Sequence, residues 1–234
     1  AMKGTRTMTR RTLFLLGGSD AFDATFDEFV PLAGGNDAEI ALLMQGGSSW
    51  EKYVPGYTSG WMSRGARRFC PVVPDESGWL DGKRVAEILY QSTGIMIGGG
   101  HTPTYQQLYA AEPVRSAIRA RYEAGVPIAG VSAGALIALR DCVLDIDETG
   151  SERTAVVPGL GLVDLVLQPH FTGNDRLPAL LQSLAASGKD TGWGIGDSAC
   201  MVFENEVLVR ILGEAVYRVT LEATSGMHMI EKVP

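Results

Sequence analysis

Apolar positions along the chain follow two alternating periods. Short unbroken apolar runs predict buried strands at residues 12–16, 39–44, 69–73, 94–97 and 126–131. Between these runs, apolar residues recur every three or four positions, which predicts helices at residues 22–32, 82–90, 105–111 and 114–124. Buried strands that alternate with helices are typical of a parallel sheet flanked by helices. The pattern therefore predicts an α/β fold.

The pattern changes from Trp193 onward. Residues 201–203, 207–212 and 216–221 are short apolar runs separated by polar turns, which predicts antiparallel strands near the C-terminus. No repeat or linker interrupts the chain, so we expect one α/β domain over residues 1–234 with a mostly parallel sheet. Residues 50–61 carry four aromatic side chains and fit neither period, and we expect them in a core or lining a pocket.

Composition limits the classes of partner and the cellular setting that we expect for the protein. The 234 residues carry a formal net charge of −7, which argues against binding nucleic acid or an anionic membrane. The three cysteines have neither disulfide-framework nor metal-ligand spacing, so we expect a cytoplasmic protein without a metal. The apolar run at residues 13–16 is preceded by Lys3, Arg6, Arg10 and Arg11, an arrangement that imitates a signal peptide. That run is too short for one, and we expect it to be the first strand.

The sharpest chemical signal is the segment GVSAGA at residues 130–135. It follows a predicted strand and precedes an apolar helical run, which is the context of a nucleophile elbow. Small residues on both sides of Ser132 allow the sharp turn that exposes its hydroxyl. The N–H of Ala133 would then point to where an oxyanion forms. The alternative is a plain turn with an inert serine.

A nucleophilic serine needs a base, and His170 lies downstream of Ser132 in the segment VLQPHF at residues 166–171. An apolar run that ends in a histidine predicts a strand whose tip carries a polar group. In hydrolases of this type the chain order is serine, acid, histidine, so we expect the acid between the two. The carboxylates in that interval are Asp141, Asp145, Asp147, Glu148, Glu152 and Asp164. The alternative for His170 is a hydrogen-bonded structural histidine.

Three consecutive glycines, residues 98–100, end a predicted strand and precede His101. They either allow a tight turn or present a second N–H to an oxyanion. His101 either lines a substrate pocket or is a loop residue satisfied by the backbone. No dinucleotide, phosphate-loop or metal motif accompanies them, so we expect no cofactor.

Three motifs in this order, IGGGHT at 97–102, GVSAGA at 130–135 and QPHFT at 168–172, resemble the peptidase E and cyanophycinase family of serine peptidases. The likeness runs from the first strand to Val219 and includes GIGD at residues 194–197. It implies a fold similar to that of class I glutamine amidotransferases, with a serine where a cysteine usually stands.

The resemblance also implies roles for individual residues. Ser132 would be the nucleophile and His170 the general base. The backbone N–H groups of Ala133 and of the glycine loop, Gly99 or Gly100, would hold the oxyanion. The family spacing puts the third triad member at Asp147, with the adjacent Glu148 as the alternative.

Substrate recognition is the last implication of the resemblance. Peptidase E cleaves after an N-terminal aspartate, and the family arginine matches Arg176, which would pair with the aspartyl carboxylate. His101 stands where peptidase E has asparagine. We therefore expect a cytoplasmic serine exopeptidase for short peptides, without a cofactor and with a homodimer as the candidate assembly. The alternatives are a cyanophycinase-like peptidase, an esterase, or an inert binding protein.

Overall fold

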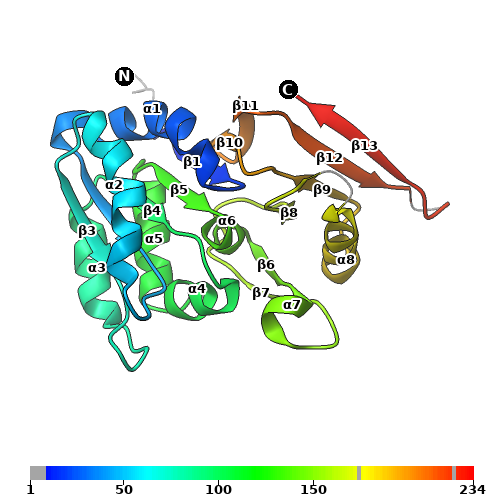
Figure 1. Cartoon of the computed structure of the whole chain (residues 1–234), viewed down its shortest axis with the longest axis horizontal. Helices are drawn as coiled ribbons and strands as arrows, with labels where there is room; N and C mark the ends of the chain where they lie inside the picture. The colour runs from blue at the N-terminus through cyan, green and yellow to red at the C-terminus, as the bar shows by residue number, and fades with distance from the viewer. Residues whose placement is uncertain (1–8, 173–174, 223–224) are drawn as a thin grey trace, which may run out of the picture.

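The structure, a computed structural model, describes residues 9–172, 175–222 and 225–234. Lys3, Arg6 and residues 173–174 before Arg176 lie outside these ranges. A seven-stranded sheet forms the centre, in the order β11-β10-β1-β5-β4-β2-β3 (Figure 1). Its strands are β1 (Thr12–Leu16), β2 (Glu39–Leu43), β3 (Arg68–Val72), β4 (Gly94–Ile97), β5 (Ile128–Val131), β10 (Ala199–Glu204) and β11 (Val207–Gly213).

The five strands from β1 to β5 are parallel, and β10 and β11 extend the sheet in antiparallel fashion beyond β1. The predicted α/β fold is therefore confirmed, as are the antiparallel strands at 201–203 and 207–212. The helices that follow the strands are α1 (Phe22–Leu32), α2 (Val54–Ser63), α3 (Gly82–Gln91), α4 (Thr102–Tyr109), α5 (Val114–Glu123) and α6 (Ala133–Ala138).

Side chains of β1 alternate between two cores, which explains the unbroken apolar run. Leu13 and Leu15 pack in the core that α3, α4, α5 and α6 cover. Phe14 and Leu16 pack on the opposite face, in the core that α1 and α2 cover. Both faces of the strand are fully buried, as expected for a parallel sheet between helical layers.

A second sheet of four strands has the order β13-β12-β9-β8. Its strands are β8 (Leu167–Gln168), β9 (Thr191–Gly194), β12 (Val216–Leu221) and β13 (His228–Val233). Helix α8 (Leu177–Ser187) shares a small core with it, made of Val166, Phe171, Leu180, Leu184 and Val219. Figure 1 shows the β12–β13 hairpin extending away from the central sheet.

A third, two-stranded sheet pairs β6 (Asp141–Leu144) with β7 (Ala155–Pro158), and the short helix α7 (Ile146–Thr149) lies between them. The segment 50–61 forms a 3-10 helix, Trp50–Tyr53, and most of α2. Among the described residues, no helix combines the length and the apolar character that crossing a bilayer requires.

Candidate active site

Ser132 lies on a strained turn between β5 and α6. Its φ of 53° and ψ of −111° are sparsely populated for a residue with a side chain. The flanking glycines are required by close backbone approach. A Cβ on Gly130 would lie 2.5 Å from the Gly134 carbonyl oxygen, and one on Gly134 would lie 2.3 Å from the Ile97 carbonyl oxygen. The sequence therefore builds a nucleophile elbow whose hydroxyl projects from the carboxyl end of the sheet.

His170 approaches the serine from the second sheet. The predicted strand into it ends early, because Pro169 lacks an N–H and His170 has a positive φ of 55°. Ile195 holds both sides of this turn, since its N–H donates to Gln168 (3.0 Å) and its carbonyl accepts from Phe171 (3.0 Å). The turn places His170 Nε2 2.7 Å from Ser132 Oγ.

Asp197 completes this chain of hydrogen bonds, because its Oδ1 lies 2.5 Å from His170 Nδ1. It stands in the turn between β9 and β10, beside Gly17 and Gly18 at the end of β1. A Cβ on Gly18 would lie 2.5 Å from Asp197 Oδ1, and one on Gly17 would lie 2.1 Å from the Gly196 carbonyl oxygen. Glycines at the end of β1 therefore make room for the carboxylate that orients the histidine.

The expectation that Asp147 or Glu148 contacts His170 is wrong in this structure. Both lie on α7, and the Glu148 carboxylate instead accepts from the Thr102 N–H (3.0 Å) and hydroxyl (2.8 Å) at the start of α4. Glu148 is thus committed to another helix end. Along the chain the order is serine, histidine, aspartate rather than serine, acid, histidine.

Of the two glycine N–H groups expected as candidates for the oxyanion, the one on Gly99 is already engaged. The Gly99 N–H donates to the Tyr57 hydroxyl across 3.1 Å. Burial raises the pKa of Tyr57, which keeps that hydroxyl protonated. Within the described part of the chain, the N–H groups of Gly100 and Ala133 make no hydrogen bond. These two are the candidates for an oxyanion hole.

His101 does not face the serine. Its Nδ1 lies 2.8 Å from the Thr104 hydroxyl, and its Nε2 lies 3.1 Å from the Glu148 carbonyl oxygen. The imidazole therefore ties the start of α4 to α7. Of the two alternatives for His101, the structure favours the loop residue over the pocket-lining one, since the two cavities that open on Ser132 are lined by other residues.

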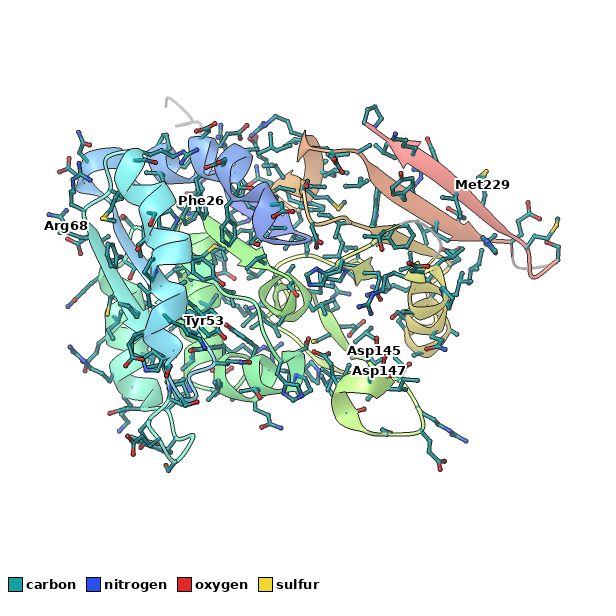
Figure 2. The ribbon with its side chains drawn as sticks, in the orientation of Figure 1. Phe26, Tyr53, Arg68, Asp145, Asp147 and Met229 are labelled. Carbon is teal, nitrogen blue, oxygen red and sulfur yellow. The ribbon has the colours of Figure 1, made fainter. Side chains whose placement is uncertain are left out.

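Two cavities meet at Ser132, His170 and Gly100. The aromatic cavity has a volume of about 560 Å³, and its ring-bearing walls are Phe22, Trp50, Tyr53, Tyr57 and Tyr105. The charged cavity has a volume of about 270 Å³ and carries Asp145, Asp147, Glu148 and Arg176. Figure 2 shows Asp145 and Asp147 at α7 and Tyr53 on the opposite side of the molecule's centre. Arg176 thus lines a cavity that also reaches Ser132, in the company of three carboxylates.

A half-buried hydroxyl on a strained turn, hydrogen-bonded to an imidazole that is itself hydrogen-bonded to a carboxylate, is the arrangement of hydrolases that use a nucleophilic side chain. The family model of Peptidase family S51 matches residues 76–211, which is more than half of the chain. The chain therefore belongs to peptidase family S51, and the resemblance found in its motifs is confirmed.

The relatives of this chain are distant in sequence. The cyanophycinase of Geminocystis herdmanii is 26% identical over 215 residues, covering 88% of this chain and 78% of the relative. The cyanophycinase of Synechococcus elongatus is also 26% identical, and the chain spans 59% of its length. The uncharacterized peptidase YgaJ of Bacillus subtilis is 28% identical over 145 residues, 60% of each chain.

Solved structures share the fold. A peptidase from an acI-B1 Actinobacterium superposes with a TM-score of 0.70 at 17% identity, covering 95% of both chains. A putative peptidase E protein from Listeria monocytogenes superposes with a TM-score of 0.63 at 14% identity, covering 96% of this chain and all of the other. At these identities the likeness concerns the fold.

Proposed function

We propose that this protein is a serine peptidase in which Ser132, His170 and Asp197 form the triad. The hydrogen-bond chain of 2.7 Å and 2.5 Å through the imidazole carries this proposal. Ser132 Oγ forms a bond to the scissile carbonyl carbon while its proton passes to His170 Nε2. The tetrahedral intermediate expels the amine, which takes that proton, and leaves an acyl-enzyme. Water, deprotonated by His170, then attacks the acyl carbon, and Ser132 Oγ leaves with the proton that His170 returns to it, which releases the acid product.

The N–H groups of Gly100 and Ala133 would stabilise the oxyanion of both tetrahedral intermediates. Ala133 supports this role because it is the first residue of α6, where the backbone N–H has no partner within the helix. The helix dipole adds partial positive charge at the same point, although α6 is short. Preorganised donors of this kind typically contribute a factor of about 10² to 10³ in kcat each.

The substrate would be a short peptide with an N-terminal aspartate. The charged cavity supports this because an N-terminal aspartate carries a positive α-ammonium and a negative side-chain carboxylate, and the cavity carries groups of both signs. The Arg176 guanidinium would pair with the side-chain carboxylate, and the carboxylates of Asp145 and Asp147 would lie near the α-ammonium. Cleavage after that residue makes the protein an exopeptidase.

The test is a panel of dipeptides with varied N-terminal residues, run on the native protein and on Ser132→Ala. Cleavage confined to N-terminal aspartate and abolished by Ser132→Ala is the expected result. A serine-directed phosphonate should label Ser132 and fail to label His170→Ala. Phosphonate labelling together with hydrolysis of esters but not of amides would support an esterase. A protein that is neither labelled nor active on esters or amides would support an inert binding protein.

A cyanophycinase-like peptidase is the second candidate. The polymer that a cyanophycinase cleaves is rich in aspartate and arginine, and the three carboxylates of the charged cavity would suit an arginine side chain. Chain-length dependence separates the two candidates. Faster cleavage of the long Asp- and Arg-rich polymer than of Asp dipeptides would favour this second activity.

A further inference from the structure

The aromatic cavity is the larger of the two cavities at Ser132, and the proposed recognition of an N-terminal aspartate leaves it unused. Its lining includes no Asp, Glu, Lys or Arg. Besides the five rings, Met44 and Val131 contribute apolar surface. A charged side chain placed there would lose its hydration without gaining a partner, whereas an apolar one would gain contact area.

The two cavities share Ser132, His170 and Gly100, so a peptide bond held at the serine has a different environment on each side. The free ammonium of an exopeptidase substrate needs a carboxylate close by. Such carboxylates line the charged cavity and are missing from the aromatic one. The N-terminal residue therefore belongs in the charged cavity, and the residue after the scissile bond belongs in the aromatic cavity.

We propose that the aromatic cavity binds the side chain of the residue that follows the scissile bond and selects aromatic or large aliphatic residues there. This inference rests on the proposed peptidase function and adds the second residue of the substrate to it. The volume of about 560 Å³ accommodates a phenylalanine or leucine side chain with its backbone. Offset or edge-to-face contacts with the surrounding rings would add to the burial of apolar surface.

Two residues that line the aromatic cavity, Tyr53 and Gly56, can be substituted to change its size or its aromatic surface. Tyr53 is 57% exposed and packs at the mouth without a side-chain hydrogen bond to any described residue. Gly56 lies on α2, and a Cβ there would meet no atom within 4 Å, so a larger side chain enters open space. Gly56→Leu should narrow the cavity, and Tyr53→Ala should remove one of its rings. Tyr90, also 57% exposed but on α3, provides the matched control Tyr90→Ala.

The test measures kcat/KM for four dipeptide amides, Asp-Phe, Asp-Leu, Asp-Ala and Asp-Lys, so that no C-terminal carboxylate intervenes. We expect Asp-Phe and Asp-Leu to exceed Asp-Ala and Asp-Lys by about tenfold or more. Gly56→Leu and Tyr53→Ala should each reduce the Asp-Phe to Asp-Ala ratio at least about threefold. Tyr90→Ala should leave that ratio unchanged. Because the readout is a ratio within one protein, a general loss of activity cancels.

Binding to Ser132→Ala, measured by calorimetry, separates this inference from the proposed function. Tighter binding of Asp-Phe amide than of Asp-Ala amide supports the cavity assignment, whether or not the native protein cleaves these amides. Failure of the native protein to cleave either amide would contradict only the proposed peptidase function. Equal binding and equal turnover of all four amides overturn the inference and leave the peptidase standing. Faster cleavage of Phe-Ala than of Ala-Phe amide also overturns it, because the aromatic side chain would then precede the scissile bond.

Discussion

His170 Nδ1–H donates a hydrogen bond to Asp197 Oδ1 across 2.5 Å, between a turn after β8 and a turn after β9. Since β8 and β9 are paired, the same pairing that builds the second sheet brings the two side chains together. The bond leaves Nε2 as the acceptor for the Ser132 hydroxyl. It thereby sets the tautomer that a general base needs.

Enlarging Gly18 should disturb the site through Asp197. A Cβ there would lie 2.5 Å from Asp197 Oδ1 and 2.9 Å from its Cβ, so the carboxylate must move. Displacement by about 1 Å can cost about 10²-fold in rate. We expect Gly18→Ala to lower kcat by about 10- to 100-fold in steady-state kinetics. An unchanged kcat would mean that the position of Asp197 does not limit turnover.

Removing the Tyr57 hydroxyl should loosen the glycine loop. It is the acceptor for the Gly99 N–H, and a hydrogen bond of this kind contributes about 1 kcal/mol net. Tyr57→Phe keeps the ring and should lower kcat about fivefold by letting the loop that carries Gly100 shift. The control is Tyr90→Phe, on an exposed face of α3. Equal rates for both variants would argue that the loop is held by other contacts.

Acid should weaken the ion pair between Lys189 and Asp164. The hydrogen bond from Lys189 holds the pKa of Asp164 below its usual value, with a further contribution from Arg140. A depressed folded-state pKa stabilises the protein above the unfolded carboxyl pKa, and this stabilisation is lost as pH falls through the folded value.

Asp164→Asn should therefore lower Tm at pH 7 and have a smaller effect at pH 2, because falling pH protonates the native carboxyl and removes the interaction that the substitution deletes. The loss is about 1 kcal/mol or less, since the Asp164 side chain is 38% exposed. Thermal unfolding at the two pH values checks this. A Tm difference of equal size at both would show that the effect is not electrostatic.

Only one thiol should react quickly in the folded protein. Cys70 is exposed, whereas burial raises the pKa of both Cys142 and Cys200 to about 12. The raised pKa keeps these two thiols protonated at neutral pH, and the thiolate is the reactive form. Titration with a chromogenic disulfide at pH 7.5 should count one thiol before denaturation and three after it. Rapid labelling of Cys142 by mass spectrometry would contradict the packing around β6.

Much of the central sheet can be predicted from the sequence because its strands are buried on both faces. The expected bounds of β1, α1 and β4 agree with the structure residue for residue. The second sheet was harder to predict. Strand β9 has the sequence TGWG, in which two glycines leave little apolar signal. Its place is set by pairing with β8 and β12 rather than by its own side chains.

The candidate site, like the fold, can be predicted from the sequence only in part. The motifs around Ser132 and His170 are local, and both residues were predicted. The sequence predicts Asp147 as the carboxylate that contacts His170 because the usual chain order places the acid before the histidine. In the structure Asp197 makes this contact, because the β8–β9 pairing brings it to His170. A signal existed in two glycine pairs, Gly17–Gly18 and the GIGD segment, which allow one strand end to approach the other. Engagement of Gly99 by Tyr57, 42 residues earlier in the chain, left no signal in the sequence.

The most direct test compares Asp197→Asn with Asp147→Asn, using kcat/KM for one cleaved dipeptide. Asn in place of the triad acid favours the wrong histidine tautomer, which costs about 10⁴-fold in serine proteases. We predict a loss of about that size for Asp197→Asn, carried by kcat. Asp147→Asn should lose less than about tenfold, mainly through KM, because Asp147 lines the charged cavity. The reverse ranking would contradict the assignment of Asp197 as the carboxylate that orients His170.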